Sequence, residues 1–181
     1  MNRELAMGAL LIPLAAYVAP AFSADYLTVA EAQQALFPEA SAFADAMLSF
    51  SDDQRDQIKK LAGTRQRSKQ QEVWRAESKG ELLGWMFVDN VIGKHEFITY
   101  AVAVSPEGNV MGIEILSYRE THGDEVREAE WRQQFTGKNL DDKLRLGKDI
   151  ANISGATLSC RNITDGVKRL LVQWDMFLRH A

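Results

Sequence analysis

Small residues gather in one stretch near the C-terminal end, which reads Ile153-Ser154-Gly155-Ala156-Thr157-Leu158-Ser159-Cys160. Gly155 is free to adopt backbone shapes that other residues avoid, and Ala156 leaves space above the chain. The segment that follows has helical periodicity, and the N-terminus of a helix favours an anion. Hydroxyls at Thr157 and Ser159 add groups that could hold a phosphate. Because such stretches are more often turns and caps, the pattern alone indicates only a candidate phosphate site.

Alternating apolar residues predict the sheet that supports this stretch. The expected strands cover residues 73–76, 82–88, 97–104 and 110–116. Turns at Ser78-Lys79-Gly80 and at residues 105–109 join the first pair and the last pair. Turns this short between strands imply an antiparallel meander rather than parallel βαβ units.

Helical spacing returns at residues 124–135 and in the last segment, where an apolar stripe is interpreted as core against one face of the sheet. Before the sheet, capping boxes at 28–31 and 51–54 begin two helices that should end at Phe37 and Gly63. Residues 64–71 form a polar linker. The predicted fold class is α+β: a twisted antiparallel sheet from about residue 72 to 117 packed against a long C-terminal helix, with N-terminal helices at one edge.

Residues 1–24 have the layout of an export signal: one Arg, an uncharged run from Leu5 to Phe22, and small residues before Asp25. The alternative is an uncleaved membrane anchor, although Pro13 and Pro20 interrupt the run. Either interpretation places the rest of the chain in the periplasm or another extracytoplasmic space. The expected organisation is a signal at 1–24, an N-terminal helical region at 25–71 and one further domain at 72–181.

Composition limits the possible functions. The chain has 181 residues and a net charge of −4, from 21 Lys+Arg against 25 Asp+Glu, so it lacks the basic character of a general nucleic-acid binder. Cys160 is the only cysteine, which excludes an intrachain disulfide and any metal site built from several thiolates. We expect no metal site, no nucleic-acid partner and no catalytic acid–base pair.

Four blocks of sequence, in this order and spacing, resemble the FMN-binding domain family. Ser154-Gly155-Ala156-Thr157 is similar to its S/T-G-A-T signature, and residues 97–116 are similar to its hairpin. Residues 118–123 resemble its H-E-T-P-G segment, and residues 131–138 its W-x-x-Q-F-x-G-K stretch. Known members include the C subunit of the sodium-pumping NADH:quinone reductase and the G subunit of the Rnf complex. The resemblance covers roughly residues 95 to 175.

The resemblance implies a covalent cofactor. Thr157 would be esterified to the phosphate of FMN, and a separate flavin transferase would deliver the FMN from FAD. The other expected contacts to FMN are Ser154, Gly155, Ala156, Leu158, Ser159, Glu120, Thr121 and Gly123. The hairpin and the final helix would supply an apolar slot for the flavin ring. Ala151 stands where the family often has Asp. Two roles stay open for His122, a proton donor to reduced flavin or a solvated turn residue. Cys160 is interpreted as a buried small residue.

Three functions follow from this resemblance. The first is an exported electron carrier with covalent FMN that works between redox partners, among them membrane-bound ones. The second is a flavin-dependent reductase with its own small substrate, and the third is a cofactor-free binding or assembly module with the same fold. The intact Thr157 favours the carrier over the module.

Overall fold

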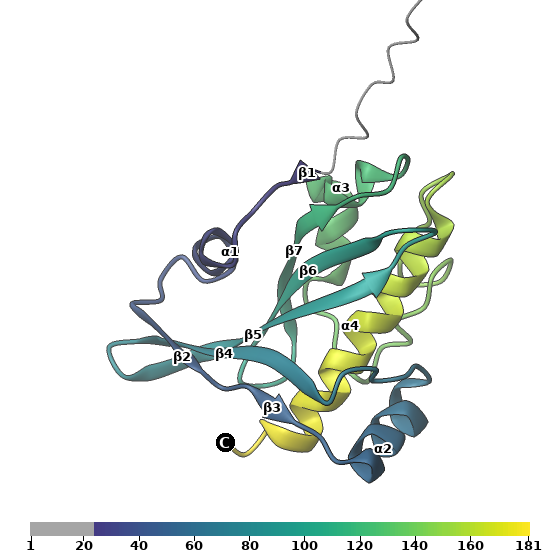
Figure 1. The fold of residues 1–181 in the computed structure, drawn as a ribbon. Helices are drawn as coiled ribbons and strands as arrows, with labels where there is room; N and C mark the ends of the chain where they lie inside the picture. Colours follow the sequence, from purple (N-terminus) through teal and green to yellow (C-terminus); the bar gives the residue numbers. More distant parts are fainter. Residues whose placement is uncertain (1–23) are drawn as a thin grey trace, which may run out of the picture.

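The computed structural model describes residues 24–181, so the predicted export signal lies outside the described residues except for Ala24. A twisted antiparallel sheet forms the centre of the molecule (Figure 1). Its strands follow the order β1-β7-β6-β5-β4-β2, and β3 also pairs with β4. Their bounds are β1 Ala24–Asp25, β2 Ala42–Asp45, β3 Leu48–Ser49, β4 Gln70–Ser78, β5 Glu81–Ile92, β6 Phe97–Val104 and β7 Val110–Tyr118.

The four longest strands confirm the predicted meander. Strands β4 to β7 pair in sequence order, each antiparallel to the next. Side chains alternate across β6, so that Tyr100 and Val102 join one core cluster while Ala101 and Ala103 join the cluster on the other face. The predicted α+β class is therefore confirmed.

Helix α4, Thr157–Phe177, covers one face of the sheet (Figure 1). It packs on β5 and β6, and its apolar stripe joins the largest core cluster, as its spacing predicted. Val167, Leu170 and Leu171 are fully buried there. This long core contact fixes the position of the helix start, where the signature lies.

Both N-terminal helices begin at the predicted capping boxes. Helix α1 spans Val29–Leu36 and helix α2 spans Asp52–Ala62, with Gly63 in the left-handed conformation at its end. Their placement differs from the expectation of one sheet edge. Helix α1 lies on the face opposite α4, against β5, β6 and β7, whereas α2 packs on α4 (Figure 1).

Region 25–71 also adds strands that the sequence analysis did not predict. Strands β1, β2 and β3 have two to four residues each and add to the ends of the sheet. Pieces this short give no readable alternation, because their pairing is set by the neighbouring long strand. The sheet is therefore wider than the predicted span of 72–117.

The helix predicted over 124–135 is divided into three short turns. A 3₁₀ turn at Asp124–Arg127 is followed by helix α3, Ala129–Arg132, and by a second 3₁₀ turn at Gln133–Phe135. Glu128 takes an extended conformation with ψ 136°, which breaks the helical path. Val126, Trp131 and Phe135 nevertheless point into the core, as helical spacing predicts. Between Ala24 and Ala181, no helix has the length and apolar character needed to cross a bilayer.

Candidate functional site

The signature forms the entry to helix α4. Thr157 is the first helical residue and Ala156 is the N-cap, with no side chain capping the helix. Thr157 is therefore half-buried at a helix start. Within residues 24–181, the amides of Thr157, Leu158 and Ser159 donate no hydrogen bond to the protein. Free amides and the positive end of a 21-residue helix suit a bound phosphate.

The space in front of the helix start is open. Gly155 has φ +87°, and a Cβ at this position would have no neighbour within 4 Å. Ser154, Gly155 and Leu158 are exposed. Asn152 donates its side-chain amide to Thr157 Oγ1 at 3.1 Å, which orients the hydroxyl oxygen. The Thr157 hydroxyl is therefore held at a site that a bulky reactant can approach.

The segment after β7 packs directly on the signature, although the two are distant in sequence. Gly123 has φ +90°, and a Cβ there would overlap the Cβ of Ala156. Tyr118, the last residue of β7, donates its hydroxyl to the carbonyl of His122 at 2.5 Å. The same hydroxyl lies 3.2 Å from Ser159 Oγ, in the first turn of α4. The structure thus brings together two of the blocks that the sequence analysis singled out.

The block at residues 131–138 holds Ala151, which lies three residues before the signature. Trp131 donates its indole N–H to the carbonyl of Ala151 at 2.9 Å, and Gln134 Oε1 accepts from the amide of Ala151 at 2.7 Å. These two side chains lie three residues apart on the short helical segment, so they hold one residue from the same side. The backbone leading to Ser154 is therefore anchored through both a donor and an acceptor.

Glu120 connects the site to the hairpin block. Its Oε1 accepts from the amides of His95 and Glu96 at 2.5 and 2.9 Å, in the turn between β5 and β6. Burial alone would raise the pKa of Glu120, but these backbone hydrogen bonds outweigh it and hold the pKa below its ordinary value. Thr121 and His122 are exposed beside it. Contact between Glu120 or Thr121 and a flavin stays a prediction.

Cys160 is fully buried in the core cluster under the helix start, as its sequence position suggested. Burial raises the pKa of its thiol, which keeps the sulfur protonated and unreactive near neutral pH. Its carbonyl accepts from Thr164 Oγ1 at 2.7 Å. The single cysteine therefore serves packing in this structure.

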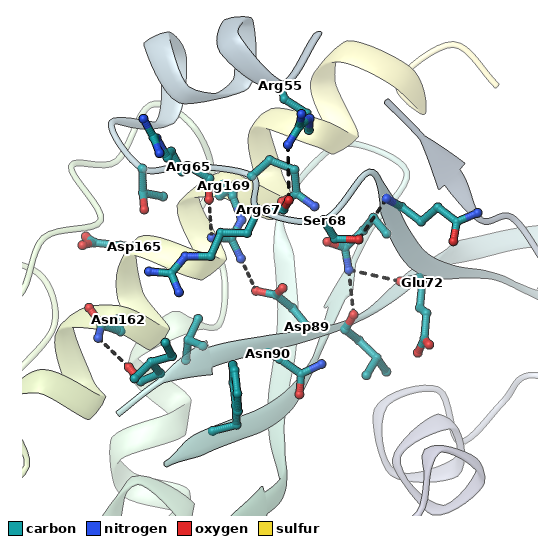
Figure 2. Close-up of a pocket in the computed structure, with 18 of the residues that line it drawn as sticks. Arg55, Arg65, Arg67, Ser68, Glu72, Asp89, Asn90, Asn162, Asp165 and Arg169 are labelled. Carbon is teal, nitrogen blue, oxygen red and sulfur yellow. Dashed lines mark hydrogen bonds and ion pairs between the residues drawn. The ribbon is translucent and has the colours of Figure 1, made fainter. Parts of the chain in front are cut away.

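A polar cavity lies to the side of the signature. It has a volume of about 1050 Å³ and lies between α2, residues 64–71, β5 and α4 (Figure 2). Arg169 donates to Asp89 Oδ2 at 2.5 Å, and Tyr100 donates to the same oxygen at 2.6 Å. Most of its lining is polar or charged, and residues 154–159 do not contribute to it.

Sequence reasoning assigned no binding role to the polar side chains around this cavity. Arg65 and Arg67 belong to the segment interpreted as a polar linker (Figure 2). The signal that was available is the charge-rich character of residues 64–71 itself. In the part of the chain from Ala24 onward, no cluster of three or more His, Cys, Asp or Glu could hold a metal ion.

These blocks meet around the start of helix α4, and comparison with known families shows which class of domain they resemble. Residues 93–172 match the FMN-binding domain family. This part of the chain contains all four blocks and is similar to that family, as the blocks suggested.

Individual relatives agree with this assignment. The chain is 32% identical over 111 residues to the G subunit of the ion-translocating oxidoreductase complex of Stutzerimonas stutzeri, covering 55% of this chain and 49% of that protein. It is 31% identical over 113 residues to the G subunit of the proton-translocating ferredoxin:NAD(+) oxidoreductase complex of Clostridium ljungdahlii, covering 58% of this chain and 60% of that protein. The matches thus span about half the length of these relatives.

A solved structure supports the fold. The crystal structure of Shewanella oneidensis NqrC superposes with a TM-score of 0.56 at 18% identity, covering 76% of this chain and 81% of that chain. At this level of identity the likeness concerns the architecture, namely the antiparallel sheet and its long C-terminal helix.

Proposed function

We propose that this protein carries FMN covalently on Thr157 and transfers electrons between redox partners outside the cytoplasm. The single observation that carries the proposal is the position of the Thr157 hydroxyl. It lies in a family signature, at an open helix start whose first three amides donate no hydrogen bond to the described protein. A phosphate attached there meets the positive end of α4.

The attachment is a phosphoryl-transfer step at one oxygen. Thr157 Oγ1 forms a bond to the phosphorus of the FMN half of FAD, and the bond from that phosphorus to the AMP oxygen breaks. AMP leaves with the bridging oxygen, and the hydroxyl proton passes to a group of the flavin transferase or to solvent. No electrons change hands, so FAD and the transferase are the only co-reactants required.

The residues around Thr157 fit a tethered FMN. The amides of Thr157, Leu158 and Ser159 would face its phosphate, and Ser154 and Gly155 leave the approach open. Gly123 and Ala156 form a close-packed wall on one side. When bound, FMN supplies the capacity to accept and release electrons. We propose that Glu120 and Thr121 border the flavin and influence its potential through the loop they shape.

Redox partners are proposed from the relatives. The G subunits of ion-translocating and proton-translocating oxidoreductase complexes resemble this chain, and the family match includes the signature. We therefore propose that its partners are redox proteins, among them membrane-bound ones, and a flavin transferase. Residues 1–24 would act as an export signal or as an anchor to the inner membrane, which would place the domain in the periplasm.

The polar cavity favours a second candidate, a flavin-dependent reductase with its own small substrate. Its volume of about 1050 Å³ is large enough for a metabolite, and its lining offers charged groups to one. Turnover separates the two candidates. A carrier reduces redox proteins and shows no saturable turnover with small acceptors, whereas a reductase shows a defined KM for one of them.

Attachment itself is tested by producing the full chain in a host that contains a flavin transferase. We expect flavin fluorescence to follow the denatured protein band on a gel for the wild type and not for Thr157→Ala. Thr136→Ala is a matched control, because Thr136 is exposed and lies outside the helix start. A fluorescent band in Thr157→Ala would place the attachment elsewhere, and a wild-type band without fluorescence would favour the cofactor-free module.

A further inference from the structure

We infer that Tyr118 is a positioning residue for flavin attachment: its buried hydroxyl locks residues 119–123 onto the first turn of α4 and so presents Thr157 to the transferase. This inference rests on the proposed function of Thr157. Tyr118 lies at the end of β7 and is 1% exposed. Its side chain reaches both segments that meet at the signature.

The hydrogen bonds of Tyr118 have a fixed direction. Its one hydroxyl proton is donated to the carbonyl of His122, at 2.5 Å, because a carbonyl can only accept. Ser159 Oγ, 3.2 Å away, must then be the donor in the second contact. The resulting chain of hydrogen bonds runs from Ser159 through Tyr118 to His122. Burial raises the pKa of Tyr118, which keeps the phenol protonated as these hydrogen bonds require.

Both ends of this hydrogen-bond chain contact residues that fix the position of Thr157. Ser159 is the third residue of α4, so fixing its side chain fixes the rotation of the turn that contains Thr157. His122 precedes Gly123, which packs against Ala156, the N-cap of the same helix. A Cβ on Gly123 would also come within 2.8 Å of the Tyr118 hydroxyl oxygen. The hydroxyl therefore lies at the point where strand, loop and helix start meet.

The hydroxyl can be separated from the ring. The Tyr118 ring belongs to the main core cluster, and phenylalanine would keep that packing. Tyr100 offers a matched control, because it is equally buried and its hydroxyl also makes a hydrogen bond, but to Asp89 beside the polar cavity. Tyr118→Phe and Tyr100→Phe each remove one buried hydroxyl, and only the first lies at the signature.

The experiment measures the rate of flavin loading by a purified flavin transferase with FAD. We expect Tyr118→Phe to lower the kcat of loading by roughly tenfold or more with little change in KM, because the reacting oxygen is misplaced while the docking surface stays. Tyr100→Phe should load within about twofold of the wild type. Wild-type loading by Tyr118→Phe, or an equal loss in both variants, would overturn the inference.

A double-mutant cycle tests whether Ser159 belongs to the same hydrogen-bond chain. Ser159→Ala removes the donor to Tyr118, so combining it with Tyr118→Phe should give a smaller loss than the product of the two single losses. Fully multiplicative losses would contradict a shared hydrogen-bond chain and overturn the inference as stated.

Hydrogen exchange in the flavin-free protein keeps the test independent of attachment. Tyr118→Phe should accelerate amide exchange around residues 119–123 and 157–160 at the amides that are hydrogen-bonded there, namely Cys160, which donates to the carbonyl of Ala156, and Val126, which donates to the carbonyl of Gly123. Tyr100→Phe should not accelerate exchange at these amides. Unchanged exchange at these amides in Tyr118→Phe would overturn the inference even if loading fell. Absence of loading in the wild type would reject the proposed function of Thr157, and the exchange data would still decide whether Tyr118 locks the two segments.

Discussion

Gly123 and Ala156 pack so closely that there is no room for a side-chain carbon on Gly123. The two residues come from different blocks of the family pattern, one after β7 and one at the start of α4. Their contact joins the loop at residues 119–123 to the N-cap of the helix that carries Thr157. The site is therefore formed by the start of α4 together with the loop at residues 119–123 that packs on it.

Gly123→Ala tests this contact. The new methyl group would overlap Ala156, and the backbone has φ +90°, which an L-residue adopts with strain. We expect a loss of about 2–3 kcal/mol in the free energy of unfolding, together with slower flavin loading. Urea unfolding measures the stability.

Gly137→Ala is the control for the backbone alone. Gly137 has φ +80° and nothing within 4 Å of a Cβ position, so its substitution should cost only about 1 kcal/mol. Equal losses in the two variants would show that the overlap with Ala156 has no energetic weight.

Gln134→Ala tests the anchoring of Ala151. It removes the oxygen that accepts from the Ala151 amide, and that residue is exposed enough for water to replace it in part. We expect a loss of about 0.5–1.5 kcal/mol in stability and a measurable fall in loading rate. Gln133→Ala is the neighbouring control, since Gln133 is exposed. Equal loading by the two variants would contradict a role for Gln134.

The difference in stability between the wild type and Glu120→Gln should depend on pH, and the hydrogen bonds from the amides of His95 and Glu96 to Glu120 fix its sign. The folded pKa of Glu120 lies below its ordinary value of 4.5, so ionised Glu120 stabilises the fold above that pH. This contribution is lost as pH falls through the lowered folded pKa. The wild type should exceed Glu120→Gln in stability by a constant margin from about pH 7 to pH 5, and the margin should shrink below that range.

Glu130→Gln provides the comparison at an exposed position outside the turn. Its substitution should change the free energy of unfolding little, because the side chain is exposed. If the stability difference between the wild type and Glu120→Gln grew as the pH falls, it would contradict the lowered pKa of Glu120. The flavin potential of the same variant tests whether Glu120 also influences the cofactor: a shift is expected, and an unchanged potential would remove Glu120 from the flavin site.

Cys160 should behave as a buried thiol. Burial and the raised pKa of its thiol predict slow labelling by a maleimide near neutral pH and fast labelling after denaturation. Cys160→Ser should cost about 1–2 kcal/mol, because a hydroxyl replaces sulfur in an apolar position. Rapid labelling of the native, flavin-loaded protein would show an accessible thiol beside the cofactor and would favour the reductase.

Much of the fold follows from local sequence signals. The capping boxes at Thr28 and Ser51 and the alternation in β6 each encode their element within a few residues. The stripe of α4 is similarly local, because apolar residues recur along it at helical spacing. The strands β1 to β3 carry no such signal, since two to four residues gain their conformation from the long strand beside them.

The candidate site shows the same division. The residues of the signature and residues 120–123 could be singled out by their resemblance to a family, but their mutual contacts could not. The overlap of Gly123 with Ala156 and the hydrogen bonds of Tyr118 depend on how β7 ends against α4. The polar cavity around Arg169 joins α2, β5 and α4, which are distant in sequence, so its only local signal is the charge-rich character of residues 64–71.

The most direct test of the central claim is the intact mass of the full chain, produced with and without a flavin transferase. With the transferase, the wild type should gain the mass of one FMN less one water, and peptide mapping should place the gain on Thr157. Thr157→Ser should gain the same adduct in part, because the nucleophilic oxygen remains, and Thr157→Ala should gain nothing. An unmodified wild type, or an FMN adduct on Thr157→Ala, would contradict the account.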